Sequence, residues 1–108
     1  MALIDKPKES DWKVFRDIVP ELRERYLRGR NAELAALLGD DSLSPTEQFW
    51  NVEKRARDIA RILRECLDGH SRSKMVSFMK LMHKHDMLTA ADLERFSLDL
   101  REMIRHRL

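Results

Sequence analysis

The chain has 108 residues, of which 43% are hydrophobic and 37% are charged, and its 21 basic and 19 acidic side chains leave a net charge of +2. This length is typical of one domain that buries about two-thirds of its unfolded surface in a single core. The near balance of charge excludes the large basic excess of a dedicated nucleic-acid-binding protein. With only three glycines and one tyrosine, the composition favours a helical fold.

The cysteine count and the N-terminal charges indicate a cellular compartment. Cys66 is the only cysteine, so the chain forms no internal disulfide, which is typical of a reducing compartment. Charges at Asp5, Lys6, Lys8 and Glu9 stand where a secretory signal has an apolar run, and no later segment has the length of a membrane span. We therefore expect a cytoplasmic protein that is not inserted in a membrane.

The first predicted helix covers about residues 11–38. Residues 1–9 are predicted to be a flexible N-terminal tail, and residues 10–108 a single helical domain. Ser10 is the predicted N-cap of the helix. The apolar stripe keeps its spacing of three and four residues through Pro20, which favours one helix kinked at that proline over two separate helices.

The second helix is predicted over 45–68. Ser44 as N-cap, Pro45 at the first helical position and Glu47 three residues after the cap form a capping box. Its inward stripe runs from Phe49 to Cys66, and Gly69 follows its end. Four pairs at i,i+4 predict salt bridges on its exposed side: Glu53 with Arg57, Lys54 with Asp58, Arg61 with Glu65, and Arg64 with Asp68.

Two further helices are predicted, over 72–85 and 90–107. The second of them has its own capping signal, in which Thr89 is the N-cap and Asp92 completes the box. With the first two helices and short connections, this pattern predicts an all-α, single-domain compact bundle of four helices.

Methionines and histidines crowd the third helix, which raises the question of a metal site. Met75, Met79 and Met82 share one helical face, but His83 and His85 lie about 160° apart on its two flanks. A closed set of four ligands therefore cannot form. We interpret the methionines as core residues and expect no metal and no cofactor.

Catalytic motifs are missing from the sequence. It contains no glycine-rich phosphate loop, no HExxH and no nucleophile elbow, so we predict no catalytic residues and a non-enzymatic protein. Cys66 lies on the apolar stripe of the second helix, where a thiol lacks the cationic surroundings that lower its pKa, and we interpret it as an inert core residue.

A run of 17 residues, 69–85, contains no acid although the rest of the chain pairs most of its charges. Four of its basic residues, Arg72, Lys74, Lys80 and Lys84, are therefore candidates for binding an anionic partner. Helical projection places Lys80 and Lys84 opposite the methionines. The alternative, that acids elsewhere in the fold neutralise the run, ranks first, because a charge run is usually a solvated face.

Trp50, early in the second helix, is the candidate anchor for an interface, because aromatic side chains are enriched at such positions. In the alternative interpretation it covers the kink at Pro20. The first functional hypothesis is a protein-interaction or regulatory module that binds another protein or a second copy of itself. The second is a nucleic-acid-associated protein that uses the basic helix over 72–85, although no helix-turn-helix signature supports base reading.

Overall fold

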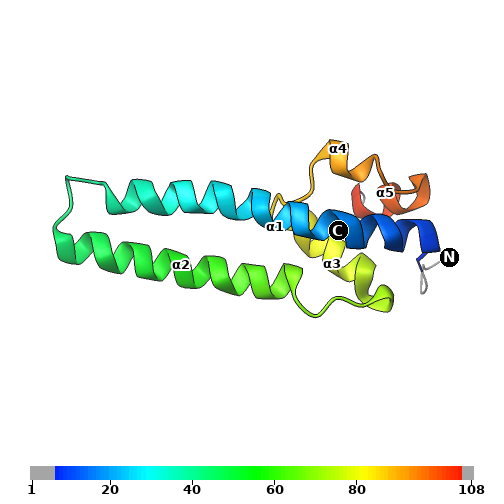
Figure 1. Cartoon of the computed structure of the whole chain (residues 1–108), viewed down its shortest axis with the longest axis horizontal. Coiled ribbons are helices and arrows are strands. Elements are labelled where there is room, and N and C mark those ends of the chain that lie inside the picture. The colour runs from blue at the N-terminus through cyan, green and yellow to red at the C-terminus, as the bar shows by residue number, and fades with distance from the viewer. Residues whose placement is uncertain (1–6, 106–108) are drawn as a thin grey trace.

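A computed structural model describes residues 7–105 of the chain (Figure 1). It consists of α1 (Glu9–Leu38), α2 (Pro45–Leu67), a 3-10 turn (Arg72–Lys74), α3 (Met75–Lys84), α4 (Ala90–Leu93) and α5 (Leu98–Arg105). No strand is present in these residues. The predicted all-α fold is confirmed; α1, α2 and α3 correspond to the first three predicted helices, and α4 and α5 together to the fourth.

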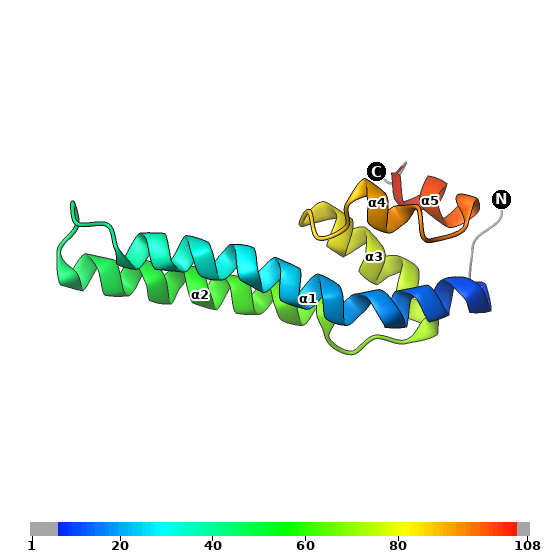
Figure 2. The ribbon, with the colours of Figure 1, turned by 45° about the horizontal axis from the view of Figure 1, so that its top comes forward.

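The two long helices form an antiparallel hairpin whose far end projects from the rest of the molecule (Figures 1 and 2). The molecule measures 55 × 24 × 21 Å. We call residues 7–26 and 61–105, where α3, α4 and α5 pack on the hairpin, the proximal half. Residues 27–60 are the distal half. The four-helix bundle is therefore confined to the proximal half.

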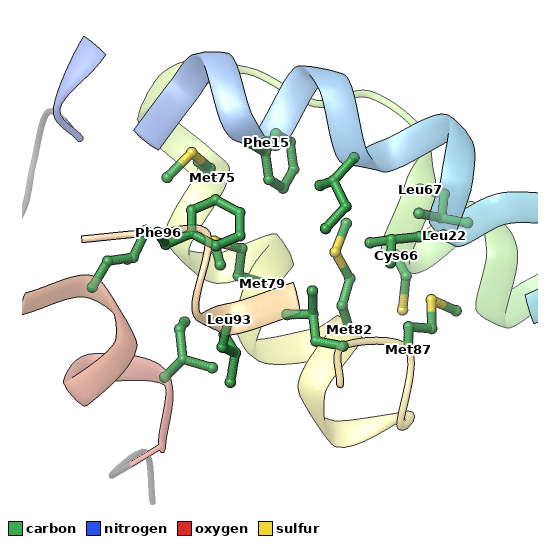
Figure 3. Packing of buried hydrophobic residues seen from close by; sticks show 14 of the residues in the cluster. Phe15, Leu22, Cys66, Leu67, Met75, Met79, Met82, Met87, Leu93 and Phe96 are labelled. Carbon is green, nitrogen blue, oxygen red and sulfur yellow. The ribbon is translucent and has the colours of Figure 1, made fainter. Parts of the chain in front are cut away.

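The hydrophobic core lies in the proximal half (Figure 3). Met75, Met79 and Met82 of α3 are fully buried there, between α1 and the C-terminal segment, and Phe15 of α1 packs in the same cluster. Each such side chain contributes about 1.5 to 3 kcal/mol through burial of apolar surface. The interpretation of the three methionines as core residues is confirmed.

α1 begins earlier than the sequence indicates. Its first residue is Glu9 and its N-cap is Lys8, whose carbonyl accepts a hydrogen bond from the Trp12 amide at 3.0 Å, so the prediction of Ser10 as N-cap is wrong. The helix continues without a break through Pro20, as predicted. Of the predicted tail over 1–9, residues 1–6 lie outside the described residues.

The predicted helix over 90–107 is divided in two. The Thr89–Asp92 capping box forms as predicted, but α4 ends at Leu93 and α5 begins at Leu98. Between them, the backbone amide and the hydroxyl of Ser97 donate hydrogen bonds to the buried Asp11 carboxylate at 2.8 and 2.7 Å. This contact with α1 fixes the chain in a non-helical turn. Residues 106–108 of the predicted helix lie outside the described residues.

The connection between α2 and α3 crosses α1. Gly69 adopts a positive φ of 72°, and the segment over 68–74 then passes along the side of α1 opposite α4 and α5 (Figure 2). His70 packs edge-on against Phe15 at 4.9 Å between ring centroids. The predicted third helix over 72–85 accordingly begins with the 3-10 turn, and α3 proper covers Met75–Lys84.

Candidate functional site at the tip of the helical hairpin

The turn between α1 and α2 is fixed by a set of short polar contacts. Ser44 accepts a hydrogen bond from the Glu47 amide and the Glu47 carboxylate accepts one from the Ser44 amide, which completes the predicted capping box. Asp40 accepts hydrogen bonds from the amide and the hydroxyl of Ser42, and these lower the pKa of its carboxyl. The Gln48 side chain donates to the Asp40 carbonyl at 2.8 Å. These bonds hold the first turn of α2 in place.

Three large apolar side chains gather at this turn, and we call them the tip cluster: Leu38 at the end of α1, and Phe49 and Trp50 in α2. They are 57%, 56% and 58% exposed, respectively. The rings of Phe49 and Trp50 meet edge to face, with centroids 4.9 Å apart. The tip cluster is thus an exposed aromatic and aliphatic surface on a well-ordered turn.

The structure decides between two interpretations of where Trp50 lies. It lies at the tip, near the level of Leu38 and about 27 Å along the hairpin from Pro20 if α1 rises about 1.5 Å per residue. The interpretation that Trp50 covers the kink is therefore wrong. The sequence also placed Phe49 on the inward stripe of α2, but the ring is exposed because α1 ends at Leu38, beside it.

Arg72, a candidate for binding an anionic partner, is bound within the fold. Its guanidinium donates to the Pro7 carbonyl at 2.7 and 3.0 Å and pairs with the Glu9 carboxylate at 2.8 Å. The acid is supplied by Glu9 at the start of α1. Arg72 therefore fixes the N-terminal end of α1 against the segment over 68–74 that connects α2 to α3.

The other three basic candidates lie on α3 and at its start. Lys74 and Lys84 are exposed, whereas Lys80 is half-buried. Within residues 7–105, none of the three forms an ion pair or a side-chain hydrogen bond. Because Arg72 is bound elsewhere and Trp50 lies at the other end of the hairpin, the five predicted partner-binding residues do not form one site.

A groove of about 710 Å³ runs beside α2 in the distal half, lined by Leu37, Asn51 and several charged side chains. Two carboxylates face it. Hydrogen bonding to Arg55 lowers the pKa of Glu33, and hydrogen bonding to Arg61 lowers the pKa of Asp58. Both groups are therefore held ionised as partners of arginines, which does not suit a general acid.

Metal-ligating and nucleophilic side chains are scattered in the described part of the chain. Residues 7–105 contain no group of three or more histidine, cysteine or carboxylate side chains that could hold a metal ion. Cys66 is fully buried, and burial raises the pKa of its thiol to about 11. The thiol therefore stays protonated at neutral pH and is a poor nucleophile.

Across residues 7–105, no helix combines the length and the apolar character that a membrane crossing requires. Comparison of the chain with models of protein families, with curated proteins and with solved structures gives no match.

Proposed function

We propose that the protein is a non-enzymatic interaction module that binds a protein partner through the tip cluster. One observation carries this proposal: Leu38, Phe49 and Trp50 are more than half exposed and the rings of Phe49 and Trp50 pack together, whereas the described aromatic residues of the proximal half are buried or half-buried. Exposed apolar groups of this kind, with a polar surround, mark interaction surfaces.

The surroundings of the tip cluster support binding rather than folding as its role. The turn is stabilised by its own polar contacts through Asp40, Ser44 and Glu47, so the three apolar side chains are not needed to close it. A rigid aromatic pair also loses little conformational entropy when a partner covers it. Both features suit Trp50 and Phe49 as anchors.

Affinity capture with matched variants tests the proposal. The tagged wild-type chain is compared with the double variant Phe49→Ser/Trp50→Ser and with Ala32→Glu, which alters an exposed residue away from the tip. We expect a protein partner that binds the wild type and Ala32→Glu and is lost from the double variant. Equal recovery from all three chains would refute a role of the tip cluster.

Fluorescence gives a second readout with purified components. The chain has two tryptophans, and Trp12→Phe leaves Trp50 as the single reporter. Binding of a captured partner at the tip should shift the Trp50 emission to the blue as its ring leaves water. An unchanged emission spectrum at saturation would place the partner elsewhere on the surface.

Nucleic-acid association is the second candidate function, and the exposed, unpaired cations Lys74 and Lys84 in the described region favour it. Electrophoretic mobility in a salt series tests it, because phosphate-driven binding weakens steeply as salt rises. We expect binding at low salt that Lys74→Ser/Lys84→Ser weakens. No shift of the nucleic acid at low salt would exclude this function.

A further inference from the structure

One face of α2 carries an aromatic side chain followed by a row of cations. The row repeats every three or four residues, and we call it the cationic stripe: Trp50, Lys54, Arg57, Arg61 and Arg64. With a turn of about 100° per residue, the five positions fall within about 80° of one another around the helix. All five side chains are exposed, so this face is open to solvent from the tip of the hairpin to the last turn of α2.

The groove beside α2 runs along this stripe. Its lining contains five cations and two acids: Lys54, Arg55, Arg57, Arg61 and Arg64, and Glu33 and Asp58. Leu37 of α1 adds an apolar side chain at the end nearest the tip. The groove is therefore positively charged, although the whole chain has a net charge of only +2.

Two cations of the stripe are free to bind a partner in the described part of the chain. Lys54 and Arg64 form no ion pair and no side-chain hydrogen bond within residues 7–105. The acids that helical spacing predicts as their partners bind arginines elsewhere in the fold instead. The fold thus leaves one positive charge without a counter-charge toward each end of the groove.

The two arginines between these cations are held in place and still have donors to spare. Arg57 is bound by Glu53, and Arg61 by Asp58 and Glu65. The side chains of Arg57 and Arg61 remain 70% and 52% exposed, respectively. Each guanidinium has five N–H donors, which is more than these bonds use. An arginine fixed in this way loses little conformational entropy when it binds a further carboxylate.

We propose that the groove binds an acidic helical segment of the protein partner, with its carboxylates on the cationic stripe and its apolar side chains against Leu37 and Trp50. The inference rests on the proposed function and names the chemistry of the partner. A helix with acids every three or four residues brings one carboxylate to each cation, because the stripe has the same spacing. The stripe is about 21 Å long, which corresponds to about 14 residues of the partner helix.

The acids beside the stripe favour a protein segment over a nucleic acid or an anionic membrane. Glu53, Asp58 and Glu65 alternate with the cations along α2. A phosphate backbone or a lipid surface presents negative charge continuously, so it would meet these acids as well as the cations. A peptide helix places each carboxylate individually and can present neutral side chains to the acids.

Fluorescence anisotropy with a designed peptide tests the inference. The probe is a fluorescein-labelled helical peptide of about 18 residues, with glutamates every three or four residues and leucines at one end. The matched probe has glutamine in place of each glutamate. We expect the wild-type chain to bind the glutamate peptide at least about tenfold more tightly than the glutamine peptide at low salt. The difference should shrink as the salt concentration rises.

Two double variants with the same loss of charge locate the binding. Lys54→Gln/Arg64→Gln removes the free cations of the groove, whereas Lys13→Gln/Arg28→Gln removes one lysine and one arginine from exposed positions of α1 outside it. We expect the first variant to bind the glutamate peptide about tenfold more weakly and the second to bind it like the wild type. Circular dichroism should show the same helix content in all three chains, because the four replaced side chains are exposed.

Several outcomes would overturn the acidic segment as the occupant of the groove. They are a wild-type chain that does not bind the glutamate peptide at low salt up to about 1 mM, equal affinity for the glutamine peptide, and equal weakening in the two double variants. A single-stranded DNA of the same net charge is the competing probe. Tighter binding of this DNA than of the peptide, lost in Lys54→Gln/Arg64→Gln, would assign the groove to nucleic acid instead.

The capture experiment separates this inference from the proposed function. If Phe49→Ser/Trp50→Ser loses the partner and Lys54→Gln/Arg64→Gln retains it, the proposed function stands and the inference is overturned. If only the groove variant loses the partner, the tip cluster is refuted as the anchor and the groove alone is the binding site. If both variants retain the partner, both proposals fail.

Discussion

The proximal and distal halves of the molecule use apolar residues in opposite ways. In the proximal half, side chains from all five α-helices meet in one cluster, and Met75, Met79 and Leu100 are wholly buried. In the distal half, Ile59 is the single buried apolar side chain among residues 27–60, while Leu38, Phe49 and Trp50 are exposed. The burial of apolar surface that stabilises the fold is therefore concentrated in the proximal half, whereas the distal half exposes large apolar side chains to solvent.

This contrast follows from the number of helices at each level. Two helices alone can shield only the seam between them, whereas three or more enclose a core. α3 is only 10 residues long and α5 only 8, so they cover only the proximal part of the 30-residue α1. The distal half keeps its helices through capping, ion pairs and the seam.

The largest effect is expected in the proximal core. Met79→Ala should lower the free energy of unfolding by about 2 to 4 kcal/mol, because it removes buried methylene groups and leaves a cavity. Urea denaturation followed by circular dichroism measures it. Ala35→Ser, an exposed change on distal α1, is the control and should stay within about 0.5 kcal/mol of the wild type.

Cys66 provides a chemical measure of the same contrast. Because burial raises its pKa to about 11 from 9.0, its thiolate fraction at pH 8 is about 100-fold lower than that of an ordinary cysteine. A thiol reagent should therefore modify native Cys66 at least about 100-fold more slowly than a cysteine introduced by Ser42→Cys at the exposed turn in a Cys66→Ser chain. Equal rates would mean that the proximal core opens readily.

Asp92 joins α4 to α1 within the proximal half, and its effect should be intermediate. Burial by itself raises its pKa, but hydrogen bonds from Arg25 and Thr89 outweigh this, so the pKa in the fold lies below its ordinary value. Asp92→Asn should lower the free energy of unfolding by about 2 kcal/mol at pH 7, because a hydrogen bond to a charged group is lost. Denaturation at pH 7 measures the difference.

The pH dependence of this difference has a defined sign. A depressed carboxyl pKa adds stability that is fully present above the unfolded value near 3.9 and is lost as the pH falls through the lower folded value. The gap between wild type and Asp92→Asn should thus be constant from pH 7 to about 5 and shrink below about 4. A gap that widens in acid would contradict the depressed pKa.

The sequence predicts helices well where a local signal begins them. The Ser44 and Thr89 capping boxes both form, because each depends on residues three positions apart. The end of α4 was not predictable in this way. Ser97 is drawn out of the helix by Asp11, 86 residues earlier, and no local pattern contains that contact.

The charge pairs show the same limit. Of the four predicted i,i+4 pairs in α2, Glu53–Arg57 and Arg61–Glu65 form. In the other two, the acid binds a different arginine, since Asp58 pairs with Arg55 and Arg61, and Asp68 with Arg23 of α1. Helical spacing identifies the charged residues that can pair within one helix. It does not show which residues of a neighbouring helix bind the same acid instead.

The candidate site was predicted in part. Trp50 was identified by its residue type alone, and the structure places it where a partner could reach it. Phe49 and Leu38 were not identified, because their exposure depends on where α1 ends relative to α2. Arg72 was predicted, like Lys84, to be a candidate for binding an anionic partner. Its pairing with Glu9 was missed because Glu9 lies 63 residues away in the sequence.

A smaller effect is expected at the hairpin turn. Ser44→Ala removes the side-chain acceptor for the Glu47 amide and should lower the free energy of unfolding by about 1 kcal/mol. Hydrogen exchange should locate the change in the first turn of α2, without faster exchange in α3. Ser73→Ala, at an exposed site in the 3-10 turn, is the control. If the Ser44→Ala variant exchanges faster in both the proximal and the distal half, the two halves unfold together.

The smallest effect on stability should come from the tip cluster, although Phe49 and Trp50 are the largest exposed apolar side chains among residues 7–105. Phe49→Ala and Trp50→Ala should each change the free energy of unfolding by less than about 0.5 kcal/mol, because most of each ring already contacts water in the monomer. A loss above about 1 kcal/mol would show that the tip helps to hold the fold. If stability is unchanged and partner capture is lost, the aromatic pair serves contact with another protein rather than the fold.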